Sequence, residues 1–165
     1  MDTSPRLSLP FLSPGQAQKE LYHNESLLIL DSLTAAAVEE PPRNDPPDPP
    51  VVATCFLVGT SPTGDWIGHA GALATYTAAG WRFVAPFEGM DAWVKSASVP
   101  ATFAQGAWQV GKLFGSKVMI SGTQVIGPQA SSIADPAGGT PVDSEARATI
   151  SSILTTLRQH GLIAS

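Results

Sequence analysis

Large aromatic rings beside carboxylates and an imidazole are the residues of this chain best suited to bind a ligand. Trp66 lies between Asp65 and His69 in a glycine-rich stretch, and Trp93 follows Asp91. An exposed indole ring can stack on the apolar face of a sugar, while neighbouring carboxylates accept hydrogen bonds from its hydroxyls. These five residues therefore form a candidate carbohydrate site. The alternative is that the rings belong to the core and the glycines only satisfy the backbone of a turn.

The sequence contains no pattern that demands an enzyme. Hydrolysis of a glycan needs two carboxylates placed across a groove, and Asp65, Glu88 and Asp91 are near one another only in sequence. The three histidines are scattered, without the spacing of a metal site. The single cysteine, Cys55, lies in an apolar run that is typical of a buried structural thiol. We expect no enzymatic activity, no cofactor and no metal.

The charge of the chain argues against nucleic acid as a partner. The 165 residues carry a net charge of −5, and the nine Lys and Arg residues form no cluster. Phosphate binding requires a basic surface. No stretch approaches the roughly eighteen apolar residues of a membrane helix, and the first residues lack the features of a signal peptide. We expect a soluble product that is made in the cytoplasm and does not insert into a membrane.

An aromatic repeat organises the middle of the chain. Rings at fixed offsets that occur twice predict one small β unit built twice, in which each copy covers the apolar side of the other. Short β-type runs separated by turn residues predict all-antiparallel pairing. The clearest is a hairpin in which residues 117–120 and 123–126 flank Ser121 and Gly122. The repeated rings are Trp66, Tyr76 and Trp81, which recur 27 positions later as Trp93, Phe103 and Trp108.

Composition divides the chain into four segments and predicts a mainly β fold with flanking α-helices. The first segment has an arm with apolar anchors, expected to lie on another surface, and a helix from Gln16 to Leu33. The segments are residues 1–40 (arm and helix), 41–50 (a spacer with six prolines), 51–130 (an antiparallel β module) and 131–165 (a capped helix for oligomerisation).

A polar cluster interrupts the apolar residues of the first helix. His23, Asn24 and Glu25 follow one another there. Buried polar groups at this place would fix the register between subunits. The alternative is a solvated helix face.

The C-terminal helix is the best-specified element of the sequence. It is predicted at about residues 141–160, with Thr140 as the cap, Pro141 at the first position and Gly161 at the left-handed position that ends it. Apolar residues at heptad spacing form a seam along this helix. Isoleucine at both an a-type and a d-type position of the seam favours three helices over two, so we expect a short homotrimeric bundle. The alternative is one helix packed on its own domain. The seam residues are Ala146, Ile150, Ile153 and Leu157, which are spaced four, three and four residues apart.

Three groups of motifs resemble those of known proteins. They are residues 9–20 (LPFLSPGQAQKE) with 23–25, residues 80–86 (GWRFVAP) with 88–90 and Trp93, and the ending with 133–139 (IADPAGG), 142–143, 145–147 and 160–164 (HGLIA). The first two groups resemble a domain family of unknown function whose members are encoded among structural genes of phages, prophages and gene transfer agents. The ending resembles the C-terminal helix of phage head-fibre and tail-fibre proteins.

The resemblance implies a virion component, such as a spike, a fibre or its adaptor, located on a phage-like particle and synthesised in a bacterial cytoplasm. It carries over no catalytic residue. We therefore expect a structural, trimeric protein that contributes to particle attachment and has other virion proteins as partners. The alternative is a carbohydrate-binding module that recognises cell-surface polysaccharide, and the two roles can coexist. A hydrolase acting on glycans is the third hypothesis.

Overall fold

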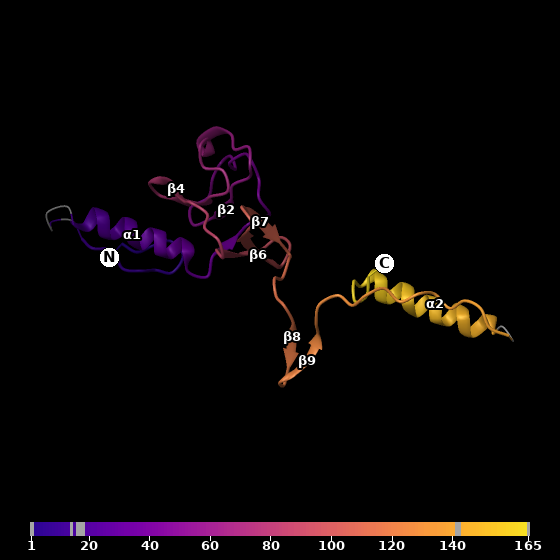
Figure 1. The fold of residues 1–165 in the computed structure, drawn as a ribbon. Helices are drawn as coiled ribbons and strands as arrows, with labels where there is room; N and C mark the ends of the chain where they lie inside the picture. Colours follow the sequence, from indigo (N-terminus) through magenta and orange to yellow (C-terminus); the bar gives the residue numbers. More distant parts are fainter. Residues whose placement is uncertain (1, 14, 16–18, 141–142, 165) are drawn as a thin grey trace. The chain divides into compact units, whose positions relative to one another are not determined.

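Short β-strands occupy the middle of the chain, and one α-helix precedes and another follows them in the sequence (Figure 1). The prediction of a mainly β fold with flanking α-helices is confirmed. In chain order, the elements are α1 (Lys19–Leu33), β1 (Ala37–Val38), β2 (Cys55–Leu57), the 3₁₀ turn η1 (Gly64–Trp66), β3 (Leu73–Thr77), β4 (Gly80–Val84), β5 (Asp91–Val94), β6 (Val99–Ala104), β7 (Ala107–Val110), β8 (Val118–Ile120), β9 (Thr123–Ile126) and α2 (Ser144–Gln159).

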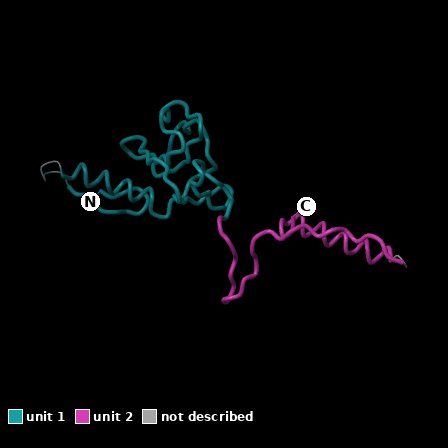
Figure 2. The backbone as a smooth tube through the Cα atoms, in the orientation of Figure 1, with its two compact units in different colours: residues 1–113 teal, residues 114–165 magenta. Residues whose placement is uncertain are grey.

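The structure, a computed structural model, describes residues 2–13, 15, 19–140 and 143–164. It divides into two units, residues 1–113 and residues 114–165, which Figure 2 colours separately. The first unit contains α1 and the strands from β1 to β7, and the second contains the β8–β9 hairpin and α2. The first residues of the predicted N-terminal helix, Gln16 to Gln18, lie outside the described residues.

The first sheet of unit 1 is antiparallel, has the order β2-β3-β4 and is covered on both faces. Successive side chains of a strand point to opposite faces, and in β3 both Leu73 and its neighbour Ala74 are fully buried. Leu73 belongs to a core cluster with residues of the second sheet, whereas Ala74 packs in a separate cluster with Trp66. The sheet is therefore the layer that separates the two parts of the core.

The second sheet has the order β1-β5-β6-β7 and includes one parallel pair. Strands β5, β6 and β7 are antiparallel neighbours, but β1 runs parallel to β5, with Ala37 opposite Trp93. Within residues 51–127 the strand pairs are antiparallel, as the sequence predicts; the parallel partner β1 comes from the N-terminal segment, where no strand was predicted. Parallel neighbours need a long crossover, and here the connection from β1 to β5 contains the proline-rich segment and the whole first sheet.

The aromatic repeat corresponds to two hairpins with the same register. Tyr76 lies directly opposite Trp81 in the β3–β4 hairpin, and Phe103 lies directly opposite Trp108 in the β6–β7 hairpin. The ring centroids are 5.0 Å apart in the first pair and 5.5 Å apart in the second, and both pairs meet edge to face. Such cross-strand pairs each stabilise a hairpin by about 0.2–1 kcal/mol. The offset of five residues in the repeat is therefore the spacing of an aromatic pair across a two-residue turn.

The N-terminal arm folds back on α1 and is held by the buried carboxylate of Asp31. This carboxylate accepts hydrogen bonds from Ser4 Oγ at 2.7 Å and from the backbone N–H groups of Arg6 and Leu7 at 3.1 and 2.6 Å. The guanidinium of Arg6 donates to backbone carbonyls at the C-terminal end of the helix, where the helix dipole favours a positive charge. The surface on which the arm lies is therefore its own helix.

The polar cluster of α1 makes contacts within the same chain. The Asn24 side chain accepts a hydrogen bond from the Leu12 N–H at 2.9 Å and donates one to the Leu12 carbonyl at 3.1 Å. Glu25 pairs with Arg82 of β4, and His23 is exposed. Asn24 and Glu25 thus fix the arm and the sheet to the helix, rather than belonging to a purely solvated face.

Helix α2 begins later than the sequence predicts. Asp143 is its N-cap, and the Asp143 carboxylate accepts a hydrogen bond from the Ala146 N–H at 2.9 Å. The prediction of Thr140 as the cap is wrong because Asp143 itself supplies the capping oxygen. Pro141, which was expected at the first helical position, lies outside the described residues.

The end of α2 agrees with the prediction. Gly161 has a φ of 70°, which favours glycine. The N–H of Gly161 donates to the Arg158 carbonyl at 2.9 Å, and the N–H of Leu162 donates to the Leu157 carbonyl at 3.0 Å. These two bonds are those of a Schellman motif.

Candidate functional site

Trp66 is part of the core and cannot stack on a ligand from solvent. The η1 turn directs its ring inward, where it is fully buried. Its centroid lies 5.8 Å from that of Phe56 and 5.2 Å from that of Trp81. Trp66 and Trp93 hold corresponding places in the repeat, but one lies in η1 and the other in β5. The two copies of the repeat therefore have the same structure in their hairpins, but the first ring of each copy, Trp66 or Trp93, lies in a different kind of element.

The two polar neighbours of Trp66 do not form a pocket with it. Asp65 is exposed, and the His69 ring stacks on the Phe83 ring with a centroid distance of 3.7 Å and an interplanar angle of 5°. Gly64, Gly68 and Gly71 all have positive φ values, a conformation that costs other residues more than glycine. The glycine-rich stretch thus serves the backbone of the turn.

Trp93 and Asp91 are the two predicted ligand-binding residues that the structure brings together. They alternate with buried residues in β5 and point away from the core, and the Trp93 side chain is 48% exposed. Both line a hollow of about 530 Å³. Asp91 Oδ1 accepts a hydrogen bond from Thr102 Oγ1 at 2.6 Å. The floor and walls of this hollow, the β5 hollow, are formed by Leu33, Ala35, Ala36, Phe87, Gly89, Met90, Asp91, Ala92 and Trp93.

Phe87 is a residue of this hollow that the sequence analysis did not select. It lies in the turn between β4 and β5 and is 54% exposed. The signal for it was present, because an aromatic residue between Pro86 and Glu88-Gly89 sits in turn-like sequence that buries few side chains. The β5 hollow thus has two exposed rings, Phe87 and Trp93, and one carboxylate.

A second hollow, of about 550 Å³, lies beside the β6–β7 hairpin. Phe103 and Trp108 line it, together with residues of the proline-rich segment such as Pro42 and of the loops of the first sheet such as Gly71. The Trp108 Nε1 donates to the Gly71 carbonyl at 2.7 Å, so its one donor is used within the chain. Both rings are half-buried. Asn44 and Thr60 also line this hollow, so it offers polar as well as apolar contacts.

Three of the side chains that could act in catalysis, Glu88, Asp91 and Cys55, each make a hydrogen bond within the chain. Glu88 Oε1 accepts a hydrogen bond from the Gln105 N–H at 3.1 Å, and Asp91 is held by Thr102. Within the part of the chain that the structure describes, no group of three His, Cys, Asp or Glu side chains could hold a metal ion. Cys55 is buried, and burial raises the pKa of its thiol, which disfavours the nucleophilic thiolate.

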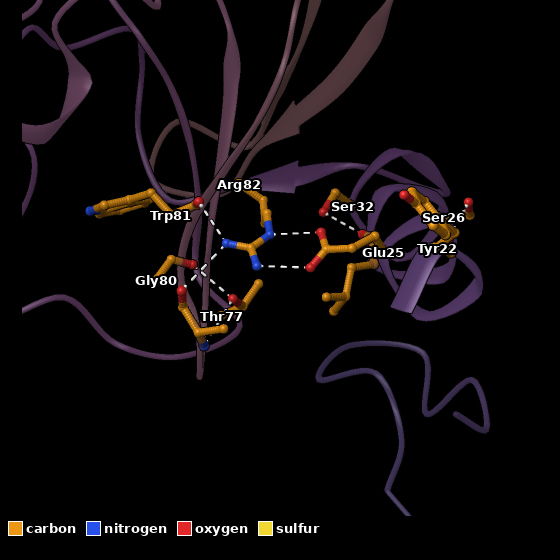
Figure 3. A network of polar contacts seen from close by, with 10 residues as sticks. Tyr22, Glu25, Ser26, Ser32, Thr77, Gly80, Trp81 and Arg82 are labelled. Carbon is orange, nitrogen blue, oxygen red and sulfur yellow. Dashed lines mark hydrogen bonds and ion pairs between the residues drawn. The ribbon is translucent and has the colours of Figure 1, made fainter. Parts of the chain in front are cut away.

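An ion pair connects α1 to the sheet (Figure 3). Arg82 Nε and Nη2 donate to Glu25 Oε2 and Oε1, each at 2.8 Å, and Arg82 Nη1 also donates to the Trp81 carbonyl at 3.1 Å. The hydrogen bond with Arg82 lowers the pKa of Glu25 and raises that of Arg82. This bidentate geometry orients the helix against β4.

The predicted oligomerisation residues form an open stripe on α2. Ala146, Ile150 and Ile153 are exposed and Leu157 is half-buried, with Ile150 at 45% and Ile153 at 54% exposure. Their heptad spacing places them on one side of the helix. Among the residues of unit 2 that the structure describes, Ala146, Ile150 and Ile153 of this seam stay exposed.

A different side of α2 is covered by the chain itself. Leu154 is buried, and Arg147 and Arg158 donate to the carbonyls of Gly138 and Ile133 in the extended segment before the helix. Because a helix turns about 100° per residue, Leu154 and the two arginines lie to one side of the seam. Within the described part of unit 2, the segment before the helix thus covers one face of α2, and the adjacent apolar face is exposed.

Comparison with known proteins identifies one family. Residues 23–109 match the family described as "Protein of unknown function (DUF2793)", which is more than half of the chain. No curated protein matches the sequence. Neither α1 nor α2, the helices of the described residues, is long and apolar enough to cross a lipid bilayer.

Proposed function

The chain belongs to the DUF2793 family of proteins of unknown function, and we propose that it is a trimeric structural component of a phage-like particle. The resemblance of its motifs to those of phage and gene-transfer-agent proteins supports this function. The proposal includes no catalytic activity. In it, the protein is a spike, a fibre or an adaptor that contributes to attachment of the particle and has other virion proteins as partners.

The open seam of α2 is the observation that carries the proposal. Ile150 and Ile153 expose an apolar stripe, and a stripe at heptad spacing is buried when helices associate. β-branched residues at both seam positions favour three helices over two. The family match ends at Gln109, before unit 2 begins. We therefore assign the association of three copies to unit 2, and the function that members of the family have in common to unit 1.

The exposed side of α1 is suited to contact another protein of the particle. Tyr22, Ile29 and Leu30 are exposed on one side of this helix, whereas Asn24 and Asp31, which hold the arm, lie on the opposite side. Exposed apolar groups of this kind mark interaction surfaces. In the proposal, unit 1 thus docks through α1 while unit 2 joins three copies.

Substitutions in the seam test the assembly part of the proposal. Ile150→Lys with Ile153→Lys places six ammonium groups in a trimeric bundle, and we expect light scattering to show a shift from about 52 kDa, three times 17.2 kDa, to the mass of one chain. Ala148→Lys is the matched control, because Ala148 is exposed on the opposite side of the helix. Equal masses for the variant and the control would contradict the role of the seam.

The location of the protein needs a separate test. Phage-like particles purified from a producing culture should contain the chain as a stoichiometric component that mass spectrometry detects. Washing with salt should not remove it. Its absence from particles that are otherwise complete would rule out the structural role, whatever the oligomeric state.

A second candidate function, the recognition of cell-surface polysaccharide, is favoured by the β5 hollow. Trp93 and Phe87 expose two rings beside the carboxylate of Asp91. Rings of this kind bind the apolar faces of sugars, and a carboxylate fixes a hydroxyl group. The binding site of this second candidate function does not include Trp66, Asp65 or His69, because they do not line the hollow.

Binding to a glycan array tests this candidate. Trp93→Ala and Phe87→Ala should each remove binding, and Asp91→Asn should weaken it. Tyr22→Ala is the control, since Tyr22 is an exposed ring on α1 that does not line the hollow. A glycan signal that survives in both ring variants would exclude the β5 hollow as its site.

A further inference from the structure

We propose that the β8–β9 hairpin is an interchain element: three copies of it pair edge to edge and close into a six-stranded barrel around the axis of the trimer. The occupant of each open strand edge is therefore a second copy of this chain. This inference rests on the trimer of the proposed function and adds a second contact to it, away from the seam of α2.

The hairpin is incomplete as a structure on its own. Among the residues that the structure describes, strands β8 and β9 pair only with each other, and every residue in both is exposed. A two-stranded hairpin without further cover is marginally stable at best in water. The exposed apolar side chains in and just before this hairpin are Leu113, Phe114, Val118, Met119, Ile120, Val125 and Ile126.

The hairpin also lacks the features that normally keep free edges apart. Open strand edges are usually protected by charged side chains, proline or a covering element. No charged residue occurs between Val118 and Ala134, and no proline lies in either strand. Edges of this composition are suited to pair with other strands.

The charges of the two units favour a copy of the same chain as the partner. Residues 1–113 carry the whole net charge of −5, whereas three basic and three acidic residues cancel in residues 114–165. Symmetric contacts bring identical charges together, and like charges repel. A neutral unit with an uncharged hairpin avoids this repulsion. The cancelling residues are Lys117, Arg147 and Arg158 against Asp135, Asp143 and Glu145.

The backbone ties the hairpin to the assembly helix. Four residues after β9, Ala130 forms a bridge with Ile163, just beyond the end of α2. The Ala130 N–H donates to the Leu162 carbonyl at 2.9 Å, and the Ala164 N–H donates to the Ala130 carbonyl at 2.8 Å. Association of the α2 helices would therefore bring the C-terminal ends of the three hairpins close together.

Cyclic symmetry determines which strands pair. In a closed trimer the contact between neighbours is heterologous, so β8 of one copy meets β9 of the next. Because β8 and β9 are antiparallel within each hairpin, all six strands then alternate in direction. Closure removes every free edge.

The register determines which face points inward. Cross-strand partners share a face, and the partners are Val118 with Ile126 and Ile120 with Thr123; a shift in register between Val118 and Met119 leaves Val125 unpaired in the hairpin and places Ile126 opposite Val118. Met119 and Gln124 are partners on the opposite face. The face with three apolar side chains lines the interior of the barrel, and the face of Met119 and Gln124 points outward.

Substitution on the two faces tests the barrel. Ile120→Lys places three ammonium groups in the interior, and we expect light scattering of the full-length chain to show loss of the trimer mass. Met119→Lys is the matched control and should keep it. All four tryptophans lie in residues 1–113, so unchanged tryptophan fluorescence shows that unit 1 is folded in each variant.

Hydrogen exchange gives a second measurement that does not depend on a substitution in the hairpin. Alternate amides of an isolated hairpin point away from the partner strand, whereas all of them are bonded in a barrel. Amides of residues 117–127 should exchange about tenfold or more slowly in the wild type than in the Ile150→Lys, Ile153→Lys chain. Rapid exchange in a wild-type trimer would overturn the barrel.

The outcomes separate this inference from the proposed function. If the Ile120→Lys variant keeps the trimer mass and the hairpin amides exchange rapidly, the barrel is contradicted and the assembly through the α2 seam stands. If the trimer mass is kept in the Ile150→Lys, Ile153→Lys variant but lost in Ile120→Lys, the assembly through the α2 seam is contradicted and the barrel stands. A wild-type chain that remains a monomer overturns both.

Discussion

Arg82 and Glu25 form a bidentate ion pair that joins β4 to α1, with both N···O distances at 2.8 Å. The pair lies 57 residues apart in the sequence. It orients the helix whose outer side, in our proposal, contacts the particle. Both side chains keep some contact with solvent, with exposures of 30% for Arg82 and 48% for Glu25.

The contribution of this pair to stability should depend on pH. Because Arg82 lowers the pKa of Glu25 in the folded state, the contribution is complete above the ordinary pKa of 4.5 and is lost as the pH falls through the lowered value. Glu25→Gln should reduce the free energy of unfolding by about 0.2–1 kcal/mol at pH 7, the range for exposed pairs. Urea unfolding followed by tryptophan fluorescence at pH 7 and pH 3 measures it.

The control for this prediction is Glu145→Gln, which removes a carboxylate from unit 2. It should leave the unfolding of unit 1 unchanged at both pH values. A difference between wild type and Glu25→Gln that is as large at pH 3 as at pH 7 would contradict the electrostatic explanation.

Trp66 and Trp93 should respond differently to truncation. Trp66→Ala removes a fully buried ring from the aromatic cluster and should lower the free energy of unfolding by about 3–5 kcal/mol. Trp93→Ala removes a ring that is half exposed and should cost much less, about 1 kcal/mol or below. Urea unfolding monitored by circular dichroism compares the two variants, and similar losses would contradict the assignment of Trp66 to the core.

The Asp31 carboxylate should control the attachment of the arm. Asp31→Ala leaves the Ser4 hydroxyl and two backbone N–H groups without their acceptor, and hydrogen bonds to a charged group are worth about 1.5–3 kcal/mol. We expect trypsin to cleave after Arg6 faster in this variant than in wild type. Asp2→Asn is the control because its side chain is exposed. Equal cleavage rates in Asp31→Ala and wild type would show that other contacts hold the arm.

Cys55 should be inert in the folded protein. Burial raises the pKa of its thiol, and its sulfur lies 3.3 Å from Thr75 Oγ1. A thiol-specific reagent at pH 8 should therefore label the native chain slowly and the urea-unfolded chain rapidly. Labelling of both at the same rate would show that the β2 strand opens frequently, in conflict with its buried position.

The hairpins and the end of α2 could be predicted from the sequence because their signals are local. Gln105 and Gly106 allow a tight turn between Phe103 and Trp108, and Gly161 ends α2 as expected. The parallel pair of β1 and β5 could not be predicted, since its strands are separated by the proline-rich segment and the first sheet.

The candidate site could be predicted only in part. Asp91 and Trp93 alternate with buried residues on one short strand, so their common direction follows from the period of a strand. The burial of Trp66 depends on rings contributed by Phe56 and Trp81 from other elements. No spacing along the chain encodes that packing, and the repeat itself suggested that Trp66 and Trp93 are equivalent.

The molar mass of the full-length chain in solution tests the central claim most directly. Light scattering coupled to size-exclusion chromatography should give about 52 kDa, three times the 17.2 kDa of one chain. A mass of 17.2 kDa at the highest concentration tested would contradict the assembly of three copies through unit 2.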